Sequence, residues 1–365
     1  MPLIIEGSRV PTRWLERKPA GRVVPIDQSD TNSASIRIAL INNMPDAALE
    51  DTELQFFDLL DAASENLPVV VKLFSLSGVP RTDRGMRHLN NFYSELEELW
   101  NTPFDALIMT GTEPKCADLR EEPYWATITQ VLDWAEENTA STILSCLAAH
   151  AGVLHSDGID RHRLDDKRFG VFEFPKLLNH QLTAGGEERV RFPHSRWNEV
   201  RADALAAHGY QVLTGSAEAG VDLFVKQKKK SLFVHFQGHP EYGAETLFKE
   251  YRRDIRRFLH REHQDYPSMP KGYFDEESTC SLISFQGFVG SERREELMEN
   301  FPEAAVVRTL RKTWQSSATG IYGNWLRYLL SKKENTSRSR TMGVLRGTAH
   351  RSSLEVMVRS RPAAL

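Results

Sequence analysis

The chain is poor in cysteine, and its three cysteines, Cys116, Cys146 and Cys280, lie far apart in sequence. No C-x-x-C pair occurs, which argues against a zinc-finger pattern and a disulfide framework. We therefore expect no metal, and cysteine usage of this kind is typical of a reducing cytoplasm. Long apolar runs are also lacking. Neither a membrane span nor a signal peptide is predicted, and no membrane is expected as a partner.

Positive charge is not in excess either. The chain has 46 Lys and Arg against 50 Asp and Glu, a formal net charge of -4. This balance gives no case for nucleic acid as the main partner. What the chain does have is length and apolar content: 365 residues, 40% of them hydrophobic, are enough for one large α/β domain or for two domains.

Strands and helices alternate through the first half of the chain. Apolar runs predict strands at residues 35–43, 69–74 and 104–111 and a fourth around Ile143, while helical spacing predicts helices after the Met44-Pro45 turn, at 86–100 and at 124–137. This order implies a mostly parallel sheet flanked by helices, in which ligands collect at the carboxyl ends of the strands. Thr110-Gly111 and Cys146 both follow such ends, so we expect them to be neighbours.

The second half has more strand signal. Short strands are predicted at 169–174, 188–192, 210–213, 223–226 and 231–236, a long helix at 244–259, irregular chain over 260–300 and a last helix at 321–330. Residues 1–34 have little periodicity and are expected to form an arm over the surface. Residues 331–365 are rich in Ser and Arg and are expected to form a disordered basic tail. The α/β domain should therefore cover residues 35–330.

Cys146 lies where a buried strand meets a helix of small residues that begins at Leu147. Backbone N–H groups at the start of a helix stabilise a thiolate and can also hold an oxyanion. This is the arrangement of a nucleophile elbow with Cys in place of Ser. The structural alternative is a small buried core residue, since free cysteines are often only that.

A cysteine nucleophile needs a base and a group that orients the base. His239 follows the strand at 231–236 as Cys146 follows its own, and Glu241 projects to the same side two residues later. His150, one helical turn beyond Cys146, is a weaker rival for the base. His235 alternates with Gln237 within a strand and is expected to be structural.

At this point the residues resemble a known family, the homoserine O-acyltransferases of the homoserine O-succinyltransferase type. The order and spacing of the matching residues agree from about Ile36 to Leu330. The matches are Asn43-Met-Pro45, Leu89-Asn-Asn-Phe-Tyr93, Thr110-Gly111, Tyr124-Trp125, Cys146, Pro193-His-Ser-Arg196, Gly238-His-Pro-Glu-Tyr242, Arg253-Asp254 and Asn324-Trp325. The resemblance implies a class I glutamine-amidotransferase-like (flavodoxin-like) α/β fold.

The resemblance also implies a ping-pong reaction in methionine biosynthesis. Cys146 would take the acyl group from acyl-CoA, and L-homoserine would then accept it with His239 as base and Glu241 as its orienting group. Acyl-CoA is a co-substrate, and no cofactor is implied. The substrate-contacting positions of the family correspond here to Lys167, Ser195, Glu250 near the amine, and Arg253 on the carboxylate.

Two departures mark the chain as a divergent member. The loop after Met44-Pro45 begins with Asp46 where the family has a loop that contains lysine, so the source of that positive charge is open. Lys115 falls where succinyl-specific members have glycine and acetyl-specific members have glutamate. Because a lysine can pair with the terminal carboxylate of a succinyl group, we expect succinyl-CoA rather than acetyl-CoA as the donor.

Several alternatives stay open at this level. An O-acetyltransferase, serine as the acceptor, and a glutamine-amidotransferase-like hydrolase on the same fold all fit the broad pattern. Ser145 and Ala148 around Cys146 argue against the amidotransferases, whose elbow usually reads Gly-x-Cys-x-Gly. A non-catalytic binding module is disfavoured because Cys146, His239 and Glu241 are all present. The oligomeric state is open, with a homodimer as one option.

Overall fold

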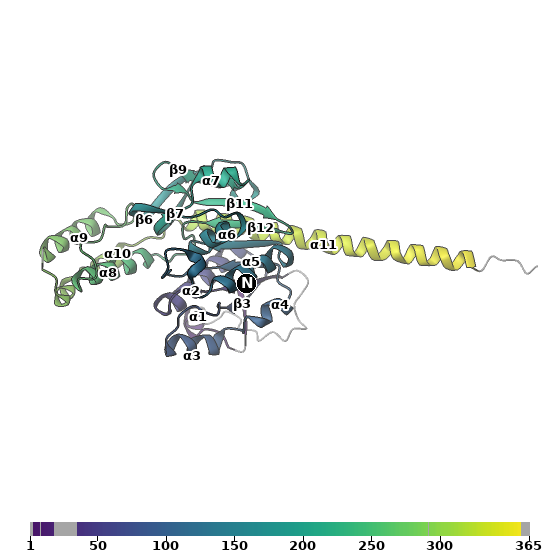
Figure 1. The fold of residues 1–365 in the computed structure, drawn as a ribbon, viewed down its shortest axis with the longest axis horizontal. Coiled ribbons are helices and arrows are strands. Elements are labelled where there is room, and N and C mark those ends of the chain that lie inside the picture. Colours follow the sequence, from purple (N-terminus) through teal and green to yellow (C-terminus); the bar gives the residue numbers. More distant parts are fainter. Residues whose placement is uncertain (1–2, 8, 18–34, 291, 359–365) are drawn as a thin grey trace, which may run out of the picture.

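The structure is a computed structural model that describes residues 3–7, 9–17, 35–290 and 292–358, with the backbone alone over 337–358. Within the described residues its centre is an eight-stranded sheet (Figure 1). Six strands of this sheet, β1, β3, β2, β4, β5 and β12, run parallel to one another, whereas β11 is antiparallel to both of its neighbours, β12 and β8. The predicted mostly parallel α/β fold is confirmed. The spatial order is β1 (Leu3–Glu6), β3 (Val69–Phe74), β2 (Ile36–Ile41), β4 (Ala106–Met109), β5 (Ser141–Ser145), β12 (Ser231–Phe236), β11 (Leu223–Lys228) and β8 (Gln211–Val212).

Helices cover both faces of this sheet. Ile38 and Leu40 of β2 belong to one buried apolar cluster, whereas Ala39 and Ile41 belong to another. The first cluster is completed by α2 (Asp46–Ser64) and α11 (Gln315–Val358), and the second by α5 (Trp125–Asn138) and α6 (Leu147–Asp157). Burial on both faces explains why the strands read as continuous apolar runs rather than as alternating patterns.

The helix predicted over residues 86–100 is two helices, α3 (Asp83–Phe92) and α4 (Glu97–Asn101). The chain leaves α3 at Tyr93, whose hydroxyl donates to Glu53 Oε1 at 2.6 Å. The next residue donates its backbone N–H to the carbonyl of Leu73 at the end of β3, 2.9 Å away. These tertiary contacts outweigh the apolar periodicity, which continues through the break.

Antiparallel strands carry the chain from α6 back to the sheet. β6 (His162–Pro175) and β7 (Arg189–Glu199) form a hairpin that includes the 3-10 turn η2 (Gln181–Thr183). α7 (Ala202–Ala207) and the short pair β9 (Gly215–Ser216) and β10 (Gly220–Val221) lie beyond it. Register places Phe169 of β6 opposite Ser195 of β7. The hairpin thereby holds the segment of Lys167 next to that of Ser195.

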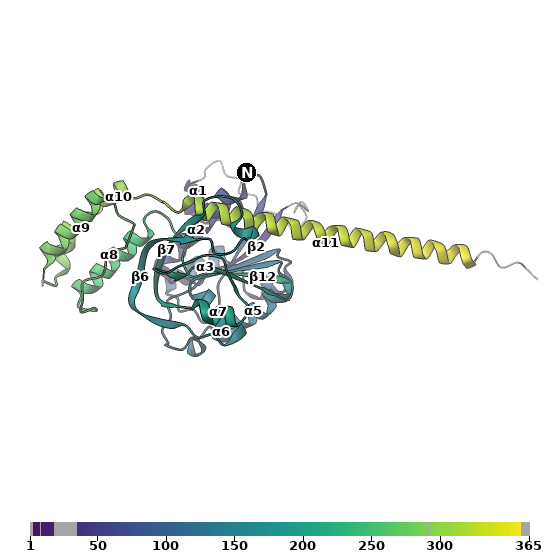
Figure 2. The ribbon, with the colours of Figure 1, turned by 90° about the horizontal axis from the view of Figure 1, so that it is seen from above.

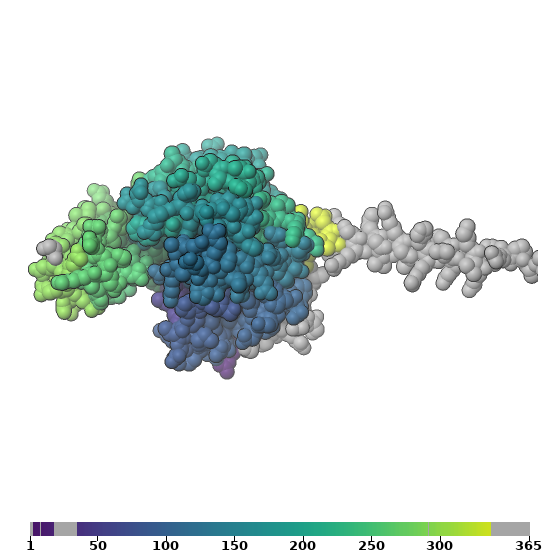
Figure 3. Space-filling model, viewed as in Figure 1, coloured from purple at the N-terminus to yellow at the C-terminus, as the bar shows by residue number. Residues whose placement is uncertain are grey.

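Residues 260–300, predicted to be irregular, contain an α-helix and a 3-10 helix. α8 (Thr246–Leu259) is followed by α9 (Glu276–Val289), η3 (Glu295–Asn300) and α10 (Glu303–Thr309). Asp275 caps α9 by accepting the N–H of Ser278 at 2.9 Å, and Leu282, Phe285 and Val289 form its buried stripe. This part stands out from the body as a lobe, green in Figures 1, 2 and 3.

The N-terminal segment is not only a surface arm. Leu3–Glu6 adds strand β1 to the sheet beside β3, and Leu3 and Ile5 are buried there. Trp14 on α1 (Thr12–Arg17) packs edge-on against Phe57 with ring centroids 5.4 Å apart. Alternating apolar residues over so short a strand give too weak a signal in the sequence. Residues 18–34 lie outside the described residues.

The disordered tail predicted from residue 331 is wrong for the described backbone, because α11 continues unbroken to Val358. Its first turns are buried around Trp325 and Leu329, and further turns then add one hydrogen bond per residue fixed without the cost of a new helix nucleus. Lys333 still contacts the body, since its Nζ donates to Asp105 Oδ2 at 2.8 Å. Farther on, α11 leaves the body (Figure 2). Within the described residues, no helix combines the length and apolar character needed to cross a membrane.

Candidate active site

Cys146 lies in a strained turn between β5 and α6. Its φ of 53° and ψ of -111° are unusual for a residue with a side chain, and strain of this kind is common at functional sites. The backbone N–H of Cys146 holds the turn in place, because it donates to the carbonyl of Phe236 on β12 at 2.7 Å. The partly buried cysteine therefore stands at the carboxyl end of the sheet, directly before the first N–H groups of α6.

Gly111 after β4 packs against this turn, as expected from the strand order. A Cβ atom at Gly111 would lie 2.8 Å from Cβ of Leu147 and 2.9 Å from its backbone nitrogen. Only a residue without a side chain permits so close an approach. The N–H of Leu147 is thus held next to the Cys146 sulfur, where it can stabilise an oxyanion.

His239 and Glu241 meet at the same edge of the sheet. His239 Nδ1 lies 2.8 Å from Glu241 Oε1, and the imidazole also interacts electrostatically with Cys146. Burial alone would lower the pKa of His239, but the charges of Cys146 and Glu241 hold it well above its usual value. The imidazole is therefore cationic near neutral pH, and a cation at this place favours the thiolate form of the cysteine.

The other histidines near the elbow have structural roles. His150 is buried, and its Nε2 is 3.0 Å from the Gln237 Oε1 that also accepts the N–H of Val200. Burial lowers its pKa to about 3, so it stays neutral. His235 is stacked on Phe224 at 4.6 Å between centroids, and burial lowers its pKa to about 3 as well.

The predicted substrate residues form one cluster beside the imidazole. Glu250 on α8 accepts a hydrogen bond from Ser195 Oγ on β7, and its Oε2 lies 3.9 Å from Lys167 Nζ on β6. Lys167 Nζ also lies 2.9 Å from Asp254 Oδ2, and Arg253 donates to the other oxygen of Asp254 from Nε at 3.1 Å. The cluster thus presents two cationic and two anionic side chains.

Tyr242 connects this cluster to the imidazole and had no role in the sequence-based prediction. Its ring stacks on His239 with centroids 4.1 Å apart, and its hydroxyl donates to Glu250 Oε1 at 2.8 Å. Asp254 was likewise recognised only as part of a motif. Although burial opposes the change, Lys167 and Arg253 hold the pKa of Asp254 below its usual value.

A buried arginine lies under the loop after Met44-Pro45. The loop itself contains no lysine to match the one in the family that the sequence resembles. Arg81 donates through NH1 to the carbonyl of Met44 at 2.5 Å and lies 3.3 Å from Asp46 Oδ1. Asn43 ties the same loop to β4, because its N–H donates to Thr110 Oγ1 at 2.8 Å. No residue pattern within the chain could have paired Arg81 with a loop 35 residues earlier.

Lys115 lies in the loop between Gly111 and the 3-10 turn η1 (Leu119–Glu121), with an exposed side chain. The loop is organised by the buried carboxylate of Glu122, which accepts the N–H of Lys115 at 2.5 Å and of Cys116 at 2.6 Å. The role of Lys115 in the choice of acyl group remains a prediction.

Fold and site together define an α/β protein that carries a Cys–His–Glu group at a strand-to-helix elbow. The sequence profile of the family described as "HTS: Homoserine O-succinyltransferase" matches residues 2–336. The chain therefore belongs to the homoserine O-succinyltransferase family, and the predicted family and acyltransferase class are confirmed.

Individual relatives agree with this assignment. The chain is 44% identical to a homoserine O-succinyltransferase of Rhodopseudomonas palustris over 297 residues, which cover 81% of this chain and 89% of that protein. It is 40% identical to one of Bradyrhizobium japonicum, with 90% of this chain and 99% of that protein covered. Among solved structures it is similar to a glutamine amidotransferase of Thermotoga maritima, with a TM-score of 0.43, 12% identity, and 81% of this chain and 98% of that chain covered.

Proposed function

We propose that the protein transfers a succinyl group from succinyl-CoA to the γ-hydroxyl of L-homoserine, as a step of methionine biosynthesis. One observation carries the proposal. The Cys146–His239–Glu241 group is joined through Tyr242 to a cluster with both signs of charge, as a zwitterionic amino acid requires. A nucleophile and an amino-acid site are therefore adjacent.

In the first half-reaction the Cys146 thiolate attacks the thioester carbonyl of acyl-CoA. The carbon–sulfur bond to coenzyme A breaks, and the departing thiolate takes the proton of the His239 imidazolium. Negative charge that develops on the carbonyl oxygen is stabilised by the N–H of Leu147 at the start of α6. The products are free coenzyme A and an acyl-thioester on Cys146.

In the second half-reaction the neutral His239 accepts the γ-hydroxyl proton as the homoserine oxygen attacks the acyl-thioester. The bond from carbon to the Cys146 sulfur then breaks, and the thiolate returns beside the imidazolium. Glu241 holds Nδ1 of the ring throughout, so that Nε2 faces the reacting atoms.

The charged cluster would bind the amino acid. Arg253 is half-exposed and contacts one oxygen of Asp254, which leaves its guanidinium able to hold the homoserine carboxylate by two hydrogen bonds. Glu250 would hold the ammonium group, with Ser195 and Lys167 fixing the position of its carboxylate.

The test is intact-mass analysis of the protein after mixing with succinyl-CoA, and then with homoserine. We expect a succinyl adduct that disappears on adding homoserine as O-succinylhomoserine forms. The adduct should be absent in Cys146→Ala and present in the matched variants Cys116→Ala and Cys280→Ala. An adduct that persists in Cys146→Ala, or release of ammonia from glutamine without acyl transfer, would overturn the proposal.

A further inference from the structure

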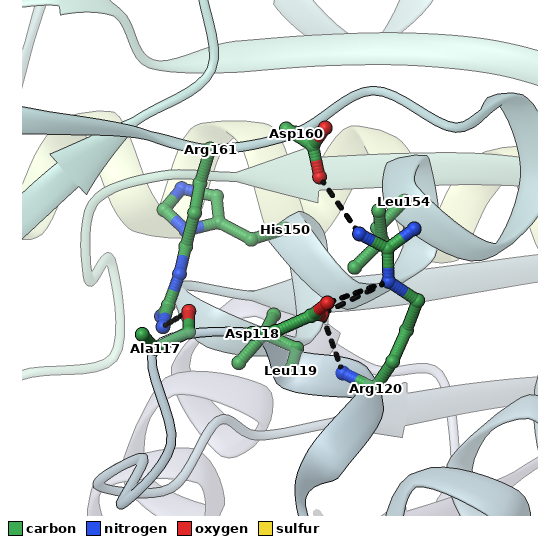
Figure 4. Close-up of a pocket in the computed structure, with 8 residues that line it drawn as sticks. All are labelled: Ala117, Asp118, Leu119, Arg120, His150, Leu154, Asp160 and Arg161. Atoms are coloured by element: carbon green, nitrogen blue, oxygen red, sulfur yellow. Dashed lines mark hydrogen bonds and ion pairs between the residues drawn. The ribbon is translucent and has the colours of Figure 1, made fainter.

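A cavity of about 230 Å³ lies beside α6, the helix that directly follows Cys146 (Figure 4). His150 and Leu154 form one wall, one and two helical turns beyond the cysteine. The loop around η1 and the segment of Asp160 and Arg161 form the others. The loop that follows Gly111 therefore connects the elbow with this cavity.

Among the described residues, Arg161 is the cation of the cavity that forms no ion pair with a carboxylate, although Glu122 and Asp118 attract it at longer range. Its NH2 donates to the carbonyls of Cys116 at 3.3 Å and Ala117 at 3.0 Å. The side chain is partly buried and interacts electrostatically with Cys146. A cation so placed can accept an anionic ligand without first giving up an ion pair.

The other charges of the cavity are already paired. Arg120 Nε lies 2.9 Å from Asp118 Oδ1, and its NH2 lies 3.5 Å from Asp160 Oδ1 (Figure 4). The two aspartates are thus paired with Arg120, and Asp118 attracts Arg161 only at longer range.

We propose that this cavity receives the distal end of the acyl group and that Arg161 binds its terminal carboxylate. The inference rests on the proposed function and assigns the residue that distinguishes a dicarboxylic acyl donor from a neutral one. Four residues of helix advance ~6 Å from Cys146 to His150. The two carboxyl carbons of a succinyl group are ~3.8 Å apart when extended, and a hydrogen bond adds about 2.9 Å. The reach of the acyl group therefore matches the start of the cavity.

Arg161 competes in this role with Lys115, which the sequence favoured. Lys115 has an exposed side chain that would give up hydration and rotamer freedom on binding, whereas Arg161 is held by two carbonyls. With NH2 held by these carbonyls, the guanidinium still has N–H groups on Nε and NH1 that can donate to a carboxylate. These differences favour Arg161.

The test compares succinyl-CoA with butyryl-CoA, a donor of equal length without the terminal carboxylate. Rates of Cys146 acylation are measured by intact mass in single turnover with enzyme in excess, so that slow donors are still quantified. Arg161→Gln should lower the ratio of succinyl to butyryl rates by about 10- to 100-fold and leave the butyryl rate unchanged. Arg161→Lys should retain part of the preference. The matched control Arg308→Gln, an exposed arginine of α10 that lies outside the cavity, should leave the ratio as it is.

An equal loss with both donors would show that Arg161 only supports the loop, and would overturn the inference. So would an unchanged ratio, or a ratio that collapses in Lys115→Gln instead. Acylation by succinyl-CoA without transfer to homoserine would refute the proposed acceptor but leave this comparison valid. Absence of acylation by either donor in the wild type would refute both proposals.

Discussion

Gly111→Ala tests the contact that places the start of α6 against the end of β4. Gly111 is not among the described glycines that have a positive φ, so alanine can adopt the same backbone conformation. The new methyl group would lie 2.8 Å from Cβ of Leu147 and 2.9 Å from its backbone nitrogen. Either β4 or the first turn of α6 must move, and the N–H of Leu147 moves with it.

The size of the effect is set by two separate costs. Overpacking of a close contact typically costs about 1–3 kcal/mol of the free energy of unfolding. Loss of one oxyanion donor typically lowers kcat by about 100- to 1,000-fold. Because displacement of a few tenths of an ångström weakens the donor without removing it, we expect a fall of about tenfold or more in the acylation rate of Cys146.

The assay is single-turnover acylation by succinyl-CoA, with chemical denaturation to measure the free energy of unfolding. The matched control is Gly287→Ala on α9, where an added Cβ meets no atom within 4 Å. That variant should acylate normally and gain up to about 1 kcal/mol from helix propensity. The reasoning is refuted if Gly111→Ala acylates at the wild-type rate, or if both variants behave alike.

Three further predictions concern the site and the C-terminal helix. Glu241→Gln removes one of the charges that raise the pKa of His239, so the imidazolium should be lost at lower pH than in the wild type. The pH at which alkylation of Cys146 changes with loss of the imidazolium should then be lower than in the wild type, and superimposable pH profiles would contradict this. Arg253→Lys keeps the charge but loses the two-pronged geometry, so the homoserine half-reaction should slow by about 10- to 100-fold while acylation is unchanged; equal damage to both would argue against the role. Lys333→Ala removes the bond to Asp105, and it should cost about 0.5–1 kcal/mol of the free energy of unfolding without changing activity.

Much of the fold could be predicted because its strands are buried on both faces. The strand β3 is six consecutive buried residues, and β2, β4 and β5 of the same sheet carry similar runs. Such runs separated by helical patterns leave few topologies. The positions of Cys146 and His239 could be predicted for the same reason, because Cys146 directly follows β5 and His239 lies three residues beyond the end of β12.

What failed was the prediction of elements whose stability comes from a few tertiary contacts. Strand β1 depends on Leu3 and Ile5 beside β3, and α9 on three buried apolar residues and the cap at Asp275. Neither has enough periodic signal to stand out from a loop. The length of α11 was missed for another reason: its polar turns continue a helix that the buried turns have already nucleated.

The site residues fall into the same two groups. Some could be predicted from their position in the sequence, and others are brought together only by tertiary contacts. Tyr242 and Glu250 lie eight residues apart, yet their hydrogen bond links the imidazole to the amino-acid cluster. Arg161 lines the cavity beside α6. In the proposed reaction, the acceptor cluster lies on the His239 side of Cys146 and the acyl cavity on the Arg161 side. Separate pockets for acceptor and acyl chain let the thioester remain in place while coenzyme A leaves and homoserine enters, and a ping-pong reaction requires this.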